Sequence, residues 1–396
     1  MTQLSDTAAA PSKPPFWNDP RTRAIVFQVL VTLGVIAVGV YLVRNLMHNL
    51  EVRGISTGFG FLANRAGFAI NQSLLAYDES SSYGRTFFVG LLNTLLVSGL
   101  GIVLATILGF VIGIARLSRN WLIAKLAAAY IEIFRNIPLL LQILFWYFAV
   151  FLNLPAPSEA LSMGDAVFLT LRGLYLPRPV PQSGFGWTVF TFLAAAVGSF
   201  VLVRWSRRRQ DTTGQLFPVF SVSLALLVLA PLGVFMISGR PLAWVMPELE
   251  GFNFTGGLSV IPELGALLMA LSIYTAAFIA ETVRAGILSV SHGQTEAASA
   301  LGLRRSWTLR LVIIPQAMRV TIPPLTSQYL NLTKNSSLAT AIGYPDLVSL
   351  FAGTTLNQTG QAVEVMAMTM AVYLTISLVI SVFMNWYNAR MALVER

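Results

Sequence analysis

Polar side chains that could contact a dissolved molecule are concentrated in the segment 321–344, inside an otherwise apolar part of the sequence. Asn331 and Asn335 stand one helical turn apart on the same face, and Lys334 lies beside them. A lysine within such a run is costly unless it faces a partner or a water-filled cavity. The sequence therefore predicts a polar path, lined by Gln328, Asn331, Lys334, Asn335, Ser336 and Ser337 together with Asn93 and Thr94 of the run 87–115.

The same polar residues could instead join neighbouring helices as structural hydrogen bonds. An isolated serine or threonine fits this structural role, whereas the density of polar side chains in 331–337 favours a path. Both interpretations stay open on the sequence alone.

Other kinds of chemistry are ruled out by residues that the sequence lacks. There is no cysteine, and the only histidines are His48 and His292, so thiol catalysis is impossible and no metal site is expected. A phosphate-binding loop of the form G-x-x-x-x-G-K-[ST] needs a lysine after a glycine. None of Lys13, Lys125 and Lys334 follows a glycine. We therefore expect neither catalysis nor a cofactor in this chain.

The composition is that of an integral membrane protein. Hydrophobic residues make up 55% of the chain and charged residues only 11%, with a mean hydropathy of +0.70. A soluble domain of ordinary composition is about 25% charged. The net charge of +9 could suggest a nucleic-acid partner. Basic residues that anchor loops at a membrane surface explain this charge better, so no nucleic acid is expected.

Long, continuously apolar runs predict an all-α, polytopic fold, because a β-barrel would show alternation instead. The first run is too long for a cleaved signal and predicts a retained anchor, preceded by a polar, Pro-rich and disordered segment at 1–23. About eight transmembrane helices are expected, at 24–43, 87–115, 137–153, 185–203, 217–237, 262–283, 321–344 and 362–386.

The distribution of arginine and lysine predicts the orientation of these helices. If the N-terminus is cytoplasmic, most basic residues fall in cytoplasmic segments, including the run RWSRRR at 204–209. The segments that then lie outside, such as 44–84 and 154–184, hold fewer. This asymmetry follows the positive-inside rule and places both termini in the cytoplasm.

Polar residues and motifs also divide the chain. They are concentrated in 84–152 and 258–388, whereas 24–83 is expected to form a first helix with a long outer loop. We expect a main membrane domain at 84–390 with an inserted helical hairpin at about 185–237. A single undivided bundle of all the helices is the alternative.

A polar, small-residue segment at 291–316 interrupts the apolar pattern. Residues 294–301 are predicted to form a good short helix that contains Glu296, Ala297 and Ala298, and Gly302 can end it in a left-handed turn. A second amphipathic piece follows and reaches Pro315, which is expected to break it. Such a pair of short helices suits docking of a partner protein, although it could also lie on lipid headgroups.

The spacing within this segment resembles the EAA loop of the permease subunits of bacterial ABC importers. EAASALG (296–302) is followed, after nine residues, by VIIP (312–315), where the family pattern has E-A-A, three residues, G, nine residues and I-x-L-P. In that family the loop docks on the ATP-hydrolysing subunit. The resemblance implies contact and turn positions at Glu296, Ala297, Ala298, Gly302, Leu303 and Arg304.

Four further stretches resemble permeases of polar amino-acid importers, and the length and extra hairpin are most similar to a permease of general L-amino-acid transporters. They are the segments 90–118, 130–148, 281–303 and 329–347. The N-terminal portion and the hairpin depart from the shorter permeases. The resemblance implies a type I importer permease core in the bacterial inner membrane.

The resemblance also implies the partners of the chain. These are a second permease, expected to be a different chain, two ATPase subunits that bind ATP and Mg²⁺, and a periplasmic amino-acid-binding protein. Two other classes stay open on the residues alone. One is an ion-coupled secondary transporter of small polar solutes, and the other is a structural or assembly protein without substrate flux.

Overall fold

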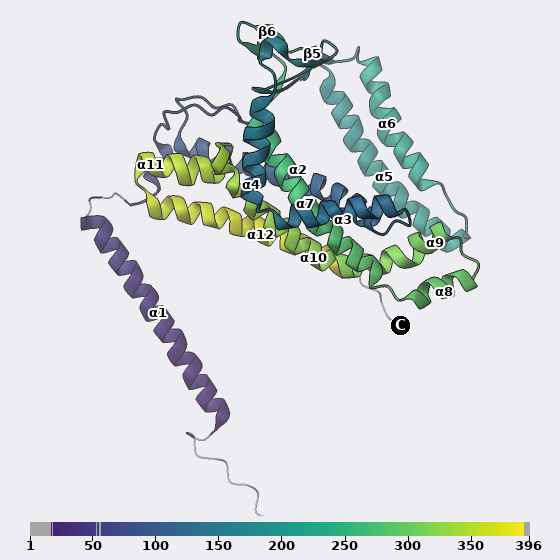
Figure 1. Ribbon diagram of the computed structural model, residues 1–396, viewed down its shortest axis with the longest axis horizontal. Coiled ribbons are helices and arrows are strands. Elements are labelled where there is room, and N and C mark those ends of the chain that lie inside the picture. The colour runs from purple at the N-terminus through teal and green to yellow at the C-terminus, as the bar shows by residue number, and fades with distance from the viewer. Residues whose placement is uncertain (1–16, 18, 53, 55–56, 392–396) are drawn as a thin grey trace, which may run out of the picture.

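The computed structural model describes residues 17, 19–52, 54 and 57–391. The disordered segment expected at 1–23 lies mostly outside these residues. The first helix, α1 (Pro20–Val52), begins at Pro20, before the expected end of that segment. In Figure 1 this helix projects away from the rest of the molecule. No residue in the most apolar 18-residue stretch of this helix is buried inside the protein. Lipid is therefore expected to surround it.

Six helices of the described chain are long and apolar enough to cross a membrane. A bent pair adds up to one more, because α3 (Trp121–Asn136) and the segment Leu139–Asn153 meet at 105°. That segment comprises α4 (Leu139–Leu144), η3 (Phe145–Val150) and η4 (Phe151–Asn153). The helical membrane fold is thus confirmed. The six are α1, α2 (Tyr83–Arg116), α5 (Phe185–Thr213), α6 (Val219–Ile237), α7 (Pro262–Leu288) and α12 (Ala362–Met391).

The count of about eight is not confirmed, because the crossing expected at 321–344 does not pass the same test. The α-helix there is α10 (Ile314–Asn335), which carries many polar residues and two internal prolines, Pro323 and Pro324. The remainder of the expected span is not α-helical. It tightens into η7 (Ser336–Ile342), and the chain then continues through η8 (Val348–Thr355) and α11 (Leu356–Thr359).

The core of the bundle is the contact between α2 and α7, which lie against each other along much of their length. A stripe of small residues on α2 makes this approach possible. A Cβ atom at Gly109 would lie 3.1 Å from the carbonyl oxygen of Ala276, and one at Gly113 would lie 2.7 Å from that of Ala280. Buried apolar side chains of α10 complete this packing, with Ile322, Leu325 and Leu332 against Ile279 and Val283.

Short strands, which the all-α prediction missed, form three small antiparallel sheets at one end of the molecule (Figure 1). They lie on either side of the α5–α6 hairpin in the sequence. The first sheet has the order β1-β2-β3-β8, while β4 pairs with β5 and β6 with β7. The strands are β1 (Leu161–Met163), β2 (Val167–Thr170), β3 (Gly173–Leu176), β4 (Arg178–Pro181), β5 (Leu242–Val245), β6 (Glu248–Glu250), β7 (Asn253–Thr255) and β8 (Leu258–Val260).

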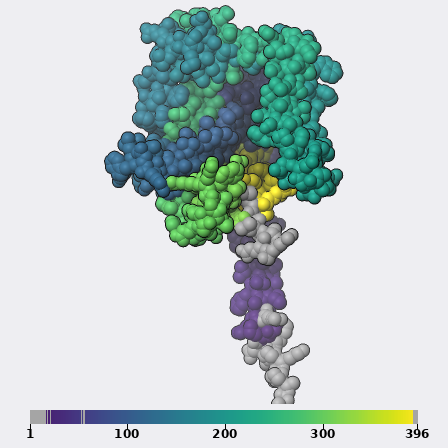
Figure 2. Space-filling view, turned by 90° about the vertical axis from the view of Figure 1, so that its right-hand side faces the viewer, coloured from purple at the N-terminus to yellow at the C-terminus, as the bar shows by residue number. Residues whose placement is uncertain are grey.

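The α5–α6 hairpin stands beside the core rather than within it. Its two helices contact mainly each other, and Figure 2 shows them as a teal column separated by a recess from the rest of the molecule. At the end away from the strands lie two short helices, α8 (His292–Ala300) and α9 (Arg305–Thr308), followed by the π-turn η6 (Leu309–Ile313). Two one-turn helices, η2 (Phe59–Ala63) and η5 (Pro157–Glu159), lie in the loops.

Gly113→Ala tests whether the fold depends on this backbone approach. The added methyl group would press on the Ala280 carbonyl, which belongs to a rigid helix, and overpacking of this kind costs about 1–3 kcal/mol. Gly99→Ala is the matched control on the same helix, because nothing lies within 4 Å of its added atom. In thermal unfolding of the purified protein in detergent, only Gly113→Ala should lower the unfolding midpoint. Equal midpoints for the two variants would contradict the packing argument.

Candidate functional site

The candidate site is built around the open face of α10. Its apolar side chains, such as Leu325 and Leu332, are buried against the bundle. The opposite face exposes Ser327, Asn331 and Lys334, which follow one another at helical spacing. A polar face on a helix inside a membrane cannot be left to lipid, because each unpaired polar group there is costly.

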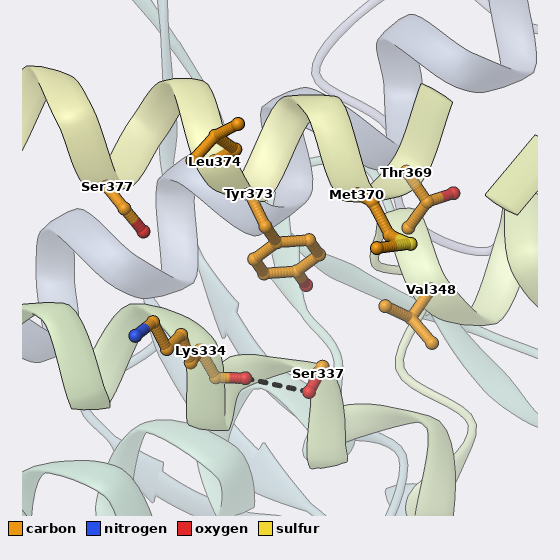
Figure 3. A pocket seen from close by; sticks show the side chains of 8 residues that line it. All are labelled: Lys334, Ser337, Val348, Thr369, Met370, Tyr373, Leu374 and Ser377. Atoms are coloured by element: carbon orange, nitrogen blue, oxygen red, sulfur yellow. Dashed lines mark hydrogen bonds between the residues drawn. The ribbon is translucent and has the colours of Figure 1, made fainter. Parts of the chain in front are cut away.

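One end of this face opens into a cavity of about 510 Å³ between α10 and α12 (Figure 3). Lys334 and Ser337, both predicted for the path, line it from one side. The Ser337 hydroxyl donates a 2.7 Å hydrogen bond to the backbone carbonyl oxygen of Lys334. The lysine amine points away from Ser337 along the gap (Figure 3). The remaining lining residues are Val348 of η8 and Thr369, Met370, Tyr373, Leu374 and Ser377 of α12.

The contribution of α12 to this cavity was not predicted. The mean hydropathy of α12 is high, so the polar residues Thr369, Tyr373 and Ser377 fall within a predicted apolar span. Thr369, Tyr373 and Ser377 are nevertheless spaced four residues apart, which places them on one helix face. That spacing is the sequence signal that could have indicated the second wall.

A second cavity, of about 310 Å³, lies near the other end of the same face, and Gln328 lines it. Arg135 of α3 is also in its wall, with its guanidinium 5.1 Å from the centre of the Phe278 ring. Glu281 faces this cavity as well and pairs with Arg284 at 2.6 Å, one helical turn further along α7. The polar face of α10 therefore connects two cavities of different character.

Asn93 and Thr94, also predicted for the path, lie inside the helix packing and are fully buried. The Asn93 amide donates to the carbonyl oxygens of Gln72, at 2.9 Å, and of Pro345, at 2.8 Å. The Thr94 hydroxyl accepts a 3.0 Å hydrogen bond from the backbone N–H of Leu347. These two side chains thus join α2 to the turn between η7 and η8 and line neither α10 cavity.

Ser336 and Asn335, the last two residues predicted for the path, are also drawn into the protein. Ser336 is buried, and its hydroxyl donates to the carbonyl oxygen of Thr333 at 2.8 Å. Asn335 is half-buried next to it. The structure therefore brings Gln328, Asn331, Lys334 and Ser337 to open surfaces and places Ser336 within the protein.

A buried carboxylate, Asp346, fixes the turn beneath the larger cavity and was not singled out from the sequence. It is only 1% exposed. One of its oxygens accepts a 2.8 Å hydrogen bond from the backbone N–H of Ser349, and the other lies 3.4 Å from the hydroxyl of Tyr373. Asp346 thereby links the start of η8 to a side chain of the cavity wall.

The 291–316 segment forms the expected pair of short helices. Gly302 ends α8 with a backbone φ of +72°, a conformation that favours glycine. Glu296, Ala297 and Gly302 are exposed, whereas Ala298 is buried and Leu303 half-buried. The carboxylate of Glu296 lies 2.9 Å from Nδ1 of His292. Arg304 is exposed at the start of α9.

One detail of this segment differs from the prediction. Pro315 does not break the second piece but stands in the first turn of α10. A proline is tolerated at this position, because its missing N–H removes no hydrogen bond that the first turn requires.

The geometry defines a class of protein: a helical membrane protein with an open polar face on one helix and a pair of exposed short helices at one end. Residues 194–393 match the profile of the family described as binding-protein-dependent transport system inner membrane component. The protein YhdX of Escherichia coli (strain K12) is 57% identical over 96% of both chains. The chain belongs to this family of inner membrane transport components.

Two further relatives have names that state what they transport. The general L-amino acid transport system permease protein AapQ of Rhizobium johnstonii is 51% identical, over 96% of this chain and 94% of its own. The glutamate/glutamine/aspartate/asparagine transport system permease protein BztB of Rhodobacter capsulatus is 44% identical over 96% of both chains.

Membership of the family has direct consequences. The chain is a multi-pass permease of an ABC importer and not itself an enzyme. ATP is bound by a partner ATPase, and a substrate-binding protein belongs to the same system.

Thr94→Val tests the structural role of the buried threonine. Valine has the same shape but no acceptor, so the N–H of Leu347 would stay buried without its partner, at a cost of about 1–3 kcal/mol. Thr191→Val is the control, since that hydroxyl of α5 bonds only to the carbonyl oxygen of Trp187 one turn earlier. Unfolding midpoints in detergent should fall for Thr94→Val alone, and an equal effect of both changes would speak against the joint.

Proposed function

We propose that this chain is the permease half of an importer that moves L-amino acids, with broad and mainly polar specificity, into the cytoplasm. The names of two relatives that align over almost the whole chain support the substrate class. The polar lining of the α10 face supports a small solute with several hydrogen-bonding groups. Lys334 would offer a positive charge to the α-carboxylate group that all amino acids share.

The observation that carries this proposal is the exposed polar face of α10. Asn331 and Lys334 lie open on a helix that is otherwise packed against α7 and α12. A second permease laid against this face would enclose it and turn it into a path between two subunits. We propose that the second permease is a different chain and that the core is of the type I importer class.

The α8–α9 segment is the proposed contact with the ATPase. Glu296, Ala297 and Gly302 are exposed at the end of the molecule opposite the strands, where no part of the described chain covers them. Gly302 sets the angle between the two short helices through its positive φ. One ATPase would dock on each permease half, so the importer would hold two.

This contact also sets the proposed orientation of the chain. The end with α8 and α9 faces the cytoplasm, together with both termini. The sheets and the loop at 57–82 then face the periplasm, where they offer an ordered surface to an amino-acid-binding protein. Hydrogen bonds such as that from Nε of Arg65 to the carbonyl oxygen of Glu79, at 2.8 Å, hold the loop in place.

Lys334→Met should separate transport from assembly. Loss of a hydrogen bond to a charged group costs about 1.5–3 kcal/mol, so uptake should fall about ten- to a hundred-fold. The measurement is uptake of radiolabelled amino acid by proteoliposomes that hold the complete importer and its binding protein. Lys125→Met, on exposed α3, is the control and should keep normal uptake. Normal uptake by Lys334→Met would remove the lysine from the path, and loss of ATPase co-purification would make its role structural.

Gly302→Ala should weaken the contact with the ATPase. Alanine in the left-handed region costs about 1–2 kcal/mol, so association should weaken about five- to thirty-fold or the loop should turn to a different angle. Gly293→Ala is the matched control on the same helix, because its φ is not positive and nothing lies within 4 Å of the added atom. Titration of the permease with purified ATPase gives both affinities. Equal affinities for the two variants, with uptake intact, would refute the coupling role of this loop.

A further inference from the structure

The free end of the α5–α6 hairpin carries a dense group of positive charges. Arg204, Arg207, Arg208 and Arg209, here called the arginine cluster, occupy the last turns of α5. The first three are exposed and share one face of the helix, at spacings of three and four residues. Asp211 is the only acidic residue between 185 and 237.

The cluster lacks partners of opposite charge. Within the described part of the chain, no carboxylate lies within 4.0 Å of any of these arginines. Arg204 instead lies over the ring of Phe200 at 5.2 Å, and Arg209 lies over that of Trp205 at 5.3 Å. Nη2 of Arg209 also donates a 2.7 Å hydrogen bond to Oε1 of Gln215. These contacts hold two of the guanidinium groups beside the helix and leave most of their N–H donors unused.

The cluster also stands at a defined depth in the membrane. The apolar part of α5, from Phe185 to Val203, is about 28 Å long at about 1.5 Å per residue, close to the thickness of the hydrocarbon layer. Arg204, the next residue along α5, therefore lies at the level of the lipid headgroups. Trp205 meets Phe217 there at 5.4 Å, edge to face, and aromatic side chains of this kind prefer the same headgroup layer.

Lipid is the main neighbour of the hairpin. Its apolar side chains, such as Phe190, Leu193 and Leu229, are half or more exposed. Figure 2 shows a recess between the hairpin and the core, and among the described elements α5 and α6 contact mainly each other. A polar contact with headgroups would hold this end in place where packing does not.

We infer that the arginine cluster binds the phosphate groups of anionic phospholipids and so anchors the hairpin to the membrane surface. Guanidinium groups match phosphate oxygens in pairs, and each basic residue near an anionic surface strengthens binding about five-fold. The leaflet rests on the proposed orientation, in which the α8 end is cytoplasmic. Lipid binding is measured without transport, so the lipid-binding inference and the proposed function can be refuted independently.

The test uses the quenching of Trp205 in the purified importer by phospholipids with brominated acyl chains. The Trp205 signal is the difference in fluorescence between the unaltered protein and Trp205→Phe. Brominated phosphatidylglycerol should quench it at roughly ten- to thirty-fold lower concentration than brominated phosphatidylcholine, and added salt should weaken this preference. Equal quenching by the two lipids would overturn the inference.

Two paired variants assign the preference to the cluster. Arg207→Gln with Arg208→Gln should abolish most of it, whereas Arg172→Gln with Arg178→Gln, at the strand end, should leave it unchanged. A preference that survives the first pair would overturn the inference. So would a phosphatidylglycerol signal that appears with the isolated permease but not with the complete importer, because the cluster would then serve the ATPase.

The chain has no cysteine, so Thr212→Cys offers a single labelling position that checks whether the variant hairpin keeps its side of the membrane. If the variant with Arg207→Gln and Arg208→Gln does not fold, the salt dependence of the phosphatidylglycerol preference in the unaltered protein still tests the inference. Its absence would overturn the inference.

Discussion

The close approach of α2 and α7 is the contact on which the rest of the structure depends. The Ala280 carbonyl of α7 takes the space of a side chain at Gly113, and the Ile279 side chain does so at Gly109, so the two helices approach closely. Lipid tails are as apolar as the helices, and only tight packing of this kind holds them together. The α2–α7 pair then provides the rigid wall against which α10 places its apolar face. The polar residues of α10 consequently turn to the other side.

Hydrogen bonds that span long stretches of sequence keep the intramembrane turn in register with this wall. Asn93 and Thr94 reach from α2 to Pro345 and Leu347, and Asp346 extends the connection to Tyr373 on α12. Hydrogen bonds of this sort are stronger where water is excluded. They position the cavity around Lys334 without lining it, which separates residues that shape the site from residues that face it.

Most of the membrane helices and the α8–α9 segment could be predicted from the sequence, because hydropathy and the Gly302 spacing act over short distances. The crossing expected at 321–344 is the exception. The division of polar residues between packing and open surface could not. Asn93 meets Pro345 across 252 positions, and no local pattern distinguishes it from Asn331. The strands escaped prediction because each has only three or four residues, too few to show alternation. The α12 wall was hidden by a hydropathy average that conceals single polar residues spaced four apart.

The sheets that flank the hairpin have a consequence for the history of the chain. β3 precedes the hairpin and β8 follows it, yet the two are hydrogen-bonded neighbours, with Leu174 opposite Val260. The polypeptide therefore leaves and re-enters the bundle at nearly the same place. An excursion closed in this way can be gained or lost in evolution without rethreading the core. The hairpin is thus a separate module of the fold, and the paired strands β3 and β8 mark the point where it joins the rest of the chain.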